Sequence, residues 1–260
     1  MTQTASDVPS DRWLAADQAA LWEAARVVAV CRDPSATTLR LHLPETPVVL
    51  PGQYYLVQLA IDAPPGAVQQ AYSLSSSAFP SGPEIEITVR EVEGGRASPL
   101  LARRVQVDDV LAVRGPFGFL TWTEQDGGPV ALIGAGSGVA PLVSIVRYAA
   151  ARGIETPMTM LCSSRDRTTV LLAEPLEELA RRHRWFTLVH TFTRSSHDPA
   201  ARFHRRIDAD MLSDVLGHAH AGLVPHCCYV AGPGDMVLSV RAALGNLGVS
   251  DDHVYSEDHA

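Results

Sequence analysis

The sequence predicts a two-domain protein in which an N-terminal antiparallel β-barrel precedes a doubly wound α/β domain with a parallel sheet. Two observations lead to this fold class. Short β-rich runs separated by turn residues fill the first half of the chain, which is typical of a barrel. In the second half, apolar runs alternate with helical segments, which is typical of a parallel sheet covered on both faces. With 260 residues, of which 46% are hydrophobic, the chain can bury the cores of two such domains.

The two domains are expected at residues 20–121 and 127–260. Residues 1–19 are polar and small and lack a sustained hydrophobic period, so we expect a flexible tail with a short helix around residues 13–22. The stretch 122–128 is polar and contains glycine, and it is suited to a linker between the domains.

Six β-rich runs define the expected barrel. Turn residues separate them at Pro51-Gly52, Pro64-Pro65-Gly66 and Gly94-Gly95. The runs are ARVVAVC (25–31), TTLRLHL (37–43), QYYLVQLAI (53–61), AYSLSS (71–76), EIEITVREV (84–92) and DVLAVRG (109–115).

The expected α/β domain contains four strands, each followed by a helix. Strands that are buried on both faces of a sheet read as continuous apolar runs. The strands are PVALIGA (129–135), PMTMLCS (157–163), FTLVHTF (186–192) and CCYVAG (227–232), and the helices cover about 140–152, 174–182, 209–216 and 235–247.

Composition excludes several classes of function. A formal net charge of −8 argues against a nucleic-acid partner, which requires a concentrated positive surface. No apolar run reaches the roughly 18 residues of a membrane-spanning helix, and the start lacks the features of a secretory signal, so we expect a cytoplasmic protein without membrane insertion. The four cysteines lack the spacing of a disulfide framework or an iron–sulfur cluster, and neither His218-Ala219-His220 nor His226-Cys227-Cys228 matches a structural zinc site. We therefore expect no metal, and any redox centre must be organic or supplied by another protein.

A glycine-rich turn joins the first strand of the second domain to its helix. The segment Gly134–Pro141 has the pattern G-x-G-x-G-x-x-P, with Gly136, Ser137 and Gly138 at its centre. Glycines let the backbone approach a pyrophosphate, and the unpaired amides of a helix start attract its charge. Pro141 suits a first helical turn. The turn predicts a dinucleotide site, with a ligand-free βα connection as the alternative.

Several motifs occur in a fixed order along the chain. They are Pro51-Gly52-Gln53, Tyr72–Ser76, Gly95–Ser98, Gly115–Gly118, Gly134–Pro141, Ser163–Arg165, Thr193-Arg194, Gly232-Pro233 with Met236, and Glu257. In this order they resemble the ferredoxin–NADP⁺ reductase superfamily, and more closely its stand-alone FAD-dependent reductases without an iron–sulfur domain. The resemblance covers nearly everything after the tail. It implies that the barrel binds FAD and that the α/β domain binds NAD(P)H.

The resemblance assigns the flavin ring to the segment around Tyr72. It implies that Tyr72 lies against the isoalloxazine and that the hydroxyl of Ser73 bonds near N5, with Leu74 and Ser75 beside them. Packing of Tyr72 in the barrel core is the alternative. The family usually places Arg two residues before the Tyr, but this chain has Gln70, which can bond a phosphate without supplying charge. FAD could therefore be held loosely.

The resemblance also assigns the FAD pyrophosphate to a turn and the start of a helix. Backbone amides and an arginine would face the phosphates there, and Ser98 is a candidate helix cap. Arg90 could instead be an exposed charge on a half-buried sheet. The implied contact residues are Thr88, Val89, Arg90, Gly95, Arg96, Ala97 and Ser98.

Near the nicotinamide, the resemblance implies contacts from Gly232, Pro233 and Met236 and from the C-terminal Glu257 and His259. Together with Tyr72 and Ser73, Glu257 is a candidate catalytic residue. His259 stands where relatives carry an aromatic residue, and a mobile tail is its alternative. The family's usual Cys before Gly232 is Ala231 here, which predicts slower or differently positioned hydride transfer rather than its loss.

The adenosine ribose is assigned to the ends of two strands. Its implied contacts are Ser163, Ser164, Arg165, Thr193 and Arg194. A guanidinium matches the 2′-phosphate of NADPH, which we therefore favour over NADH; if both arginines are only solvated charges, NADH serves equally.

The resulting functional hypothesis is an FAD-dependent reductase that moves hydride from NAD(P)H to flavin and passes electrons to a ferredoxin, an oxygenase component or a haem protein. Arginine pairs and triplets at 103–104, 181–184 and 205–206 could steer an acidic carrier, or could be ordinary solvated helix faces. Two alternatives stay open: a reductase that releases free reduced flavin, and a flavin-binding subunit that has lost hydride transfer.

Overall fold

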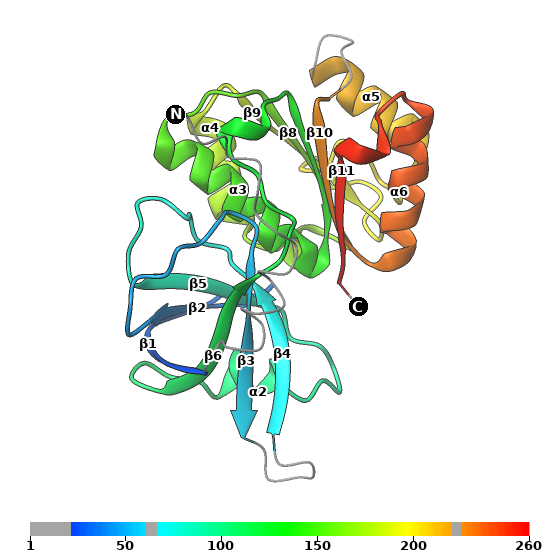
Figure 1. The fold of residues 1–260 in the computed structure, drawn as a ribbon. Coiled ribbons are helices and arrows are strands. Elements are labelled where there is room, and N and C mark those ends of the chain that lie inside the picture. The colour runs from blue at the N-terminus through cyan, green and yellow to red at the C-terminus, as the bar shows by residue number, and fades with distance from the viewer. Residues whose placement is uncertain (1–21, 61–66, 220–224, 260) are drawn as a thin grey trace, which may run out of the picture.

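The computed structural model describes residues 22–60, 67–219 and 225–259. It contains an antiparallel sheet packed beneath a parallel sheet with helices, as Figure 1 shows. The expected tail at residues 1–19, nearly all of the helix expected around residues 13–22, the turn Pro64–Gly66 and His220 lie outside the described residues.

The N-terminal sheet has six strands in the order β4-β3-β6-β1-β2-β5. Alternate side chains of these strands fill its interior, and the aliphatic residues Val27, Leu39 and Val57 are completely buried. The strands are β1 (Glu23–Arg32), β2 (Thr37–His42), β3 (Tyr54–Ala60), β4 (Ala67–Ser73), β5 (Glu84–Val89) and β6 (Val110–Phe117). The expected barrel is confirmed.

The barrel closes where β4 ends. Leu74 forms an isolated bridge with Ile87 of β5, and the Ser75 amide donates to the Glu86 carbonyl at 2.8 Å. The expected strand at residues 71–76 therefore stops at Ser73, because the chain there leaves β3 and turns toward β5.

A short helix, α2 (Ser98–Arg103), follows the turn after β5. Ser98 was expected as its cap, but the N-cap residue is Ala97. The Ser98 hydroxyl instead accepts a hydrogen bond from the Val92 amide at 3.0 Å, so it fixes the preceding turn rather than the helix.

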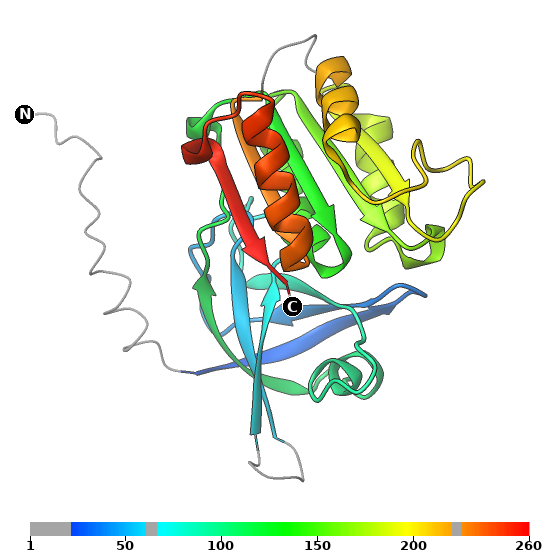
Figure 2. The ribbon, with the colours of Figure 1, turned by 90° about the vertical axis from the view of Figure 1, so that its right-hand side faces the viewer.

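The C-terminal sheet has five parallel strands in the order β11-β10-β7-β8-β9. Helices α3 and α4 cover one face and α5 and α6 the other, each over its own buried cluster (Figures 1 and 2). This confirms the doubly wound fold. The elements are β7 (Val130–Ala135), α3 (Val139–Arg152), β8 (Met158–Ser164), α4 (Ala173–Arg182), β9 (Phe186–Phe192), α5 (Ala209–Ala219), β10 (Cys227–Gly232), α6 (Gly234–Asn246) and β11 (Val254–Asp258).

Two features of this domain were not predicted. The strand β11 pairs in parallel with β10, from Cys228–Val254 to Gly232–Asp258. The stretch 122–128 joins the two sheets as expected, yet it is anchored: Trp122 is completely buried against the α3 face, and its indole N–H donates to the Gly127 carbonyl at 3.0 Å. One large apolar side chain therefore fixes a segment whose other residues are polar.

Among the described helices, none combines the length and apolar character needed to cross a membrane.

Candidate functional site

A cavity of about 600 Å³ lies where the barrel meets the α/β domain, within the usual size of a cofactor site. Both domains contribute to its wall: β4, the end of β5 and the turn before α2 on one side, and the start of α3 and the residues around the end of β11 on the other. Of the predicted site residues, those lining it are Gln70, Tyr72, Ser73, Thr88, Arg90, Gly95, Arg96, Ala97, Ser98, Ser137, Glu257 and His259.

The barrel wall places two hydroxyl-bearing residues, Tyr72 and Ser73, at the cavity. Tyr72 is only 9% exposed, and its buried hydroxyl has no hydrogen bond to any described residue. Burial raises the pKa of Tyr72 to about 12, so the phenol stays protonated at neutral pH. Ser73, the next residue, is also 9% exposed and lines the cavity. Leaving a buried hydroxyl unpaired costs about 1–3 kcal/mol, which fits a wall built to bond a ligand.

Arg90 extends from the end of β5 toward the glycine-rich turn. Its Nη1 lies 2.9 Å from the position that a Cβ on Gly136 would take, and the φ of Gly136, +58°, favours glycine there. Burial, followed by the nearby charge of Arg165, lowers the pKa of Arg90. Neither guanidinium forms an ion pair with any residue that the structure describes. Two uncompensated positive groups beside a glycine turn fit a phosphate-containing ligand.

The glycine-rich turn has the geometry that its sequence predicts. Residues 136–138 form one 3₁₀ turn between β7 and α3, and no side chain caps the start of α3. Ser137 and Ala140 reach the cavity wall. Gly138 packs against the backbone of Ala231 in β10, and Pro141 is buried in the first turn of α3.

The segments Ser163–Arg165 and Thr193-Arg194 lie side by side. The Thr193 amide donates to the Ser164 carbonyl at 2.9 Å, and the Arg194 amide donates to the Arg165 carbonyl at 2.8 Å. Arg165 and Arg194 are exposed, whereas the Ser164 hydroxyl is buried without a partner among the described residues. These residues do not line the cavity, but Arg165 is near enough to Arg90 for its positive charge to lower the pKa of Arg90.

The C-terminal residues complete the cavity. The His259 amide donates to the Gly232 carbonyl at 2.9 Å, and its ring Nε2 lies 3.3 Å from Glu257 Oε2. The structure thus places His259 in the cavity wall rather than in a free tail. Behind the wall, Pro233 caps α6, and the Met236 side chain lies close to Gly232.

The residues next to Gly232 in β10 have apolar surroundings. Ala231 is completely buried. Burial raises the pKa of the Cys227 thiol to about 11 and that of Cys228 to about 12, so both are protonated core thiols, as expected.

Three predicted site residues are directed away from the cavity. Leu74 and Val89 belong to the barrel core, and Ser75 is completely buried with its hydroxyl bonded to Thr88. Leu74 and Ser75 lie where the chain has turned toward β5. Val89 points inward because neighbouring residues of a strand alternate between its two faces.

The cavity wall also contains residues that the sequence analysis missed, namely Tyr54, Ala71, Val92, Ala140 and Asp258. Tyr54 directly follows the Pro51-Gly52-Gln53 motif and pairs with Ser73 across the strands, so a pairing argument would have found it. Val92 and Ala140 come from segments far apart in sequence and carry no local signal.

Within the described residues, no group of three or more His, Cys, Asp or Glu side chains is arranged to hold a metal ion.

Comparison with known proteins gives two family models in the order of the two sheets. The model for an oxidoreductase FAD-binding domain matches residues 24–122, and that for an oxidoreductase NAD-binding domain matches residues 132–242. Together they cover most of the chain.

Curated relatives and solved structures agree with these matches. The chain is 28% identical over 219 residues to the ferredoxin–NAD(P)⁺ reductase component of a Pseudomonas putida naphthalene 1,2-dioxygenase system, covering 84% of this chain and 63% of the relative. It is 26% identical over 226 residues to a Comamonas terephthalate 1,2-dioxygenase reductase component, covering 86% and 64%. The crystal structure of the Amycolatopsis cytochrome P450 reductase GcoB superposes with a TM-score of 0.78 at 25% identity, covering 92% of this chain and 70% of that one. The chain thus spans slightly less than two thirds of the curated relatives' length.

Proposed function

This chain belongs to the ferredoxin–NADP⁺ reductase superfamily, and we propose that it is an NAD(P)H-dependent flavoprotein oxidoreductase that delivers electrons to a protein acceptor. One observation carries the proposal. A single cavity is lined by Tyr72 and Ser73 from the FAD-binding domain and by Ser137 from the NAD-binding domain. Two ligands held on these walls would meet inside one shared space.

The barrel wall would hold the FAD. Tyr72 offers an aromatic face and a protonated hydroxyl, and Ser73 offers a second hydroxyl that can donate or accept. Arg90, Arg96 and the amides at the start of α2 would hold the phosphates. When bound, the flavin couples the two-electron chemistry of a dihydronicotinamide to one-electron carriers.

The α/β wall would hold the nicotinamide nucleotide. The turn at Gly136–Gly138 would receive the pyrophosphate, and Glu257 and His259 would face the nicotinamide from the C-terminal side. Arg165 and Arg194 are exposed beside each other at two strand ends, which supports NADPH over NADH because guanidinium groups match a 2′-phosphate.

The class of electron acceptor is inferred from the similar proteins. Those proteins are reductase components of dioxygenase systems and a cytochrome P450 reductase, so a ferredoxin, an oxygenase component or a haem protein is the class of acceptor we infer. The arginine clusters give this little support, because Arg103 pairs with Glu91, Arg181 with Glu178 and Arg205 with Asp208. A cytoplasmic location is part of the proposal.

A second candidate is a reductase that releases reduced flavin. Gln70 favours it, because this exposed neutral side chain lines the cavity at the position where the family resemblance implies an arginine for the FAD phosphates.

An anaerobic spectral titration tests the proposal. Purified protein is loaded with FAD and titrated with NADPH and, separately, NADH, while the flavin absorbance is followed. Bleaching at stoichiometric nucleotide, with lower apparent Kd for NADPH, is expected. Many-fold turnover of added free flavin without a protein acceptor would select the second candidate. Bound FAD that responds to neither nucleotide would indicate a non-catalytic subunit, and failure to bind FAD at all would overturn the proposal.

A further inference from the structure

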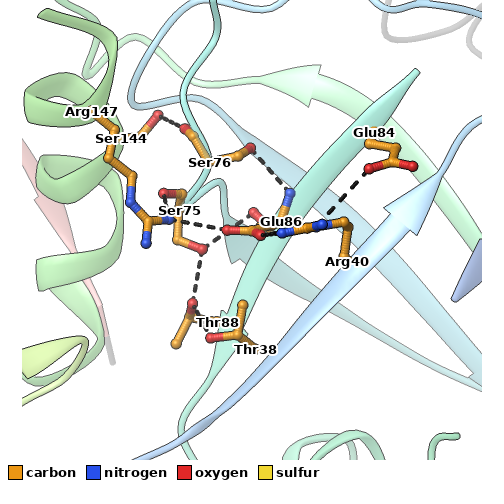
Figure 3. A network of polar contacts seen from close by, with 9 residues as sticks. All are labelled: Thr38, Arg40, Ser75, Ser76, Glu84, Glu86, Thr88, Ser144 and Arg147. Carbon is orange, nitrogen blue, oxygen red and sulfur yellow. Dashed lines mark hydrogen bonds and ion pairs between the residues drawn. The ribbon is translucent and has the colours of Figure 1, made fainter. Parts of the chain in front are cut away.

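Helix α3 connects the cavity to a second contact between the domains. Its first turn follows the glycine-rich turn in the cavity wall, and Ser144 and Arg147 lie further along the same helix. Eight residues separate Val139 from Arg147, which corresponds to about 12 Å along a helix. Both side chains contact the segment that follows β4, as Figure 3 shows.

Arg147 joins α3 to two segments of the barrel, namely strand β5 and the residues that follow β4. Its Nη1 donates to the Ser75 carbonyl at 2.6 Å and pairs with Glu86 Oε2 at 3.0 Å. The Arg147 and Glu86 side chains are only 22% and 19% exposed, so the pair is less screened than a surface ion pair. The other Glu86 oxygen accepts from Arg40 at 2.8 Å, which holds Glu86 in place from the barrel side (Figure 3).

Ser144 makes the second connection. Although it lies in the middle of a helix, its hydroxyl is completely buried, donates to the Ser76 carbonyl at 2.7 Å and accepts from the Gly52 amide at 3.3 Å. The φ of Gly52 is +99°, and a Cβ there would lie 2.0 Å from the Leu120 carbonyl oxygen. Only glycine therefore lets the backbone of residue 52 lie this close to Leu120. The Pro51-Gly52-Gln53 motif thus serves the contact between domains.

These contacts lead back to the cavity through short links. Ser75 and Ser76 follow Ser73 within three residues, and Ser75 accepts a hydrogen bond at 2.8 Å from Thr88, which lines the cavity. Helix α3 therefore adjoins the glycine-rich turn at its N-terminus and contacts the residues that follow Tyr72 and Ser73 at its middle.

We propose that Arg147 and Ser144 are positioning residues that fix the glycine-rich turn relative to the Tyr72–Ser73 segment. The inference rests on the proposed function, in which the reacting atoms of two bound nucleotides must meet at a defined separation. A displacement of about 1 Å between reacting partners can reduce a rate about a hundredfold, so a polar contact outside the cavity can govern the reaction.

The test compares four variants of the full-length, FAD-loaded protein, including Arg147→Lys as the conservative replacement. Arg147→Met keeps the length and packing of the side chain but removes its charge and hydrogen bonds. Ser144→Ala removes the second connection. Arg181→Met is the matched control, because Arg181 is exposed on α4 and pairs only with Glu178 of its own helix. The limiting rate of flavin bleaching by excess NADPH, the nucleotide Kd and the thermal midpoint are measured for each.

A second readout measures domain placement without any reaction. Cys31 on β1 is the exposed cysteine of this chain, whereas Cys162, Cys227 and Cys228 are buried. Spin labels on Cys31 and on an introduced thiol, Ser213→Cys on the exposed face of α5, report the distribution of distances between the two domains.

Arg147→Met is expected to lower the limiting bleaching rate by about tenfold or more and to broaden the distance distribution, with nucleotide Kd within about twofold of wild type. Arg147→Lys should restore part of the rate, since an ammonium can still pair with Glu86. Ser144→Ala should change both readouts in the same direction and stands as the test if Arg147→Met does not fold. Wild-type rates and an unchanged distribution in both variants would overturn the inference while leaving the proposed function intact. Absence of bleaching in wild type would instead refute the proposed function, and the distance distributions would still decide the positioning role.

Discussion

The two walls of the cavity are built in different ways. The inner part of the barrel wall uses nearly buried side chains, with exposed fractions of 9% for Tyr72, 9% for Ser73 and 5% for Thr88, whereas Gln70 and Arg96 at its edge are exposed. The α/β wall uses a backbone turn at Gly136–Gly138, and its neighbouring arginine, Arg165, is exposed. A wall of buried side chains suits a ligand that stays, and an open wall of backbone amides suits one that exchanges in every catalytic cycle.

Arg90 is the exception that joins these two walls. It belongs to the barrel, yet its guanidinium approaches the glycine-rich turn of the other domain. The two walls are therefore separate in their construction but share at least one charged group. Substitutions on either wall, and at Arg90, can test that separation.

The largest effect is expected from damage confined to the α/β wall. Gly136→Val places a β-branched residue at φ +58° with its Cβ 2.9 Å from Arg90 Nη1, so the turn must rearrange. Nucleotide Kd should rise by about a hundredfold, while FAD Kd changes by less than about threefold. Spectral titration measures both constants. Gly217→Ala, on α5 with no atom within 4 Å of the added Cβ, is the control. Equal loss of both ligands would show that the two walls are not separable.

Arg90→Gln should weaken both ligands, because the residue lies between them. Loss of one guanidinium–phosphate contact corresponds to about a tenfold rise in Kd for FAD and for NADPH. Arg26→Gln, on exposed β1 with a 3.9 Å ion pair to Asp108, controls for the loss of one charge from the barrel. If only one of the two constants changes, Arg90 serves a single wall and the shared role is refuted.

Gln70→Arg changes the barrel wall alone, and it should strengthen the binding of FAD without changing that of the nicotinamide nucleotide. The new charge would face the cavity where Gln70 lines it, and FAD Kd should fall by about threefold to tenfold. Gln69→Arg, the exposed neighbour that does not line the cavity, adds the same charge elsewhere on β4. Equilibrium dialysis of FAD against each variant gives the constants. An equal gain from both variants would mean that overall charge, not the position of residue 70, determines affinity.

The smallest effect concerns stability and lies in the α/β domain. Burial lowers the pKa of His190 below its usual 6.5, so the unfolded chain takes up the proton first. Stability from this residue is therefore fully present above about pH 6.5 and is lost as the pH falls below it. Urea unfolding from pH 7.5 to 5 should show a steeper loss in wild type than in His190→Leu, by at most about 1.4 kcal/mol per pH unit for one proton. His197→Leu, at an exposed site, should follow wild type; parallel curves for all three proteins would remove His190 as the cause.

Much of this architecture follows from the sequence because its patterns are local. Short β-rich runs separated by turn residues predicted the first sheet, and continuous apolar runs predicted the second. The strand ends at Ser163–Arg165 and Thr193-Arg194, which the sequence analysis assigned to one ribose, lie side by side. The strand β11 was missed, because Val254–Asp258 is short and mostly polar and depends on β10 for its pairing. Trp122 was assigned to a linker because its neighbours are polar, and its burial depends on contacts that lie elsewhere in the sequence.

Site residues could be predicted where they belong to a sequence motif, but not where the fold brings distant segments together. Tyr72, Ser73 and Arg90 reach the cavity, but Leu74, Ser75 and Val89 from the same motifs do not, since strand alternation and the turn after β4 decide direction. The contact between Arg147 and Ser75 joins residues 72 positions apart. No local pattern encodes it, because each of its partners is ordinary in its own segment.

The buried position of Trp122 makes this residue a natural fluorescence reporter. Trp22 and Trp185 are half-buried, so among the described tryptophans only Trp122 is sealed from water, and it sits where the chain passes from one sheet to the other. An indole in such surroundings emits at short wavelength, and hydration moves the emission to the red. Loosening of the core on the α3 side, to which Trp122 belongs, would therefore register as a red shift of the intrinsic emission.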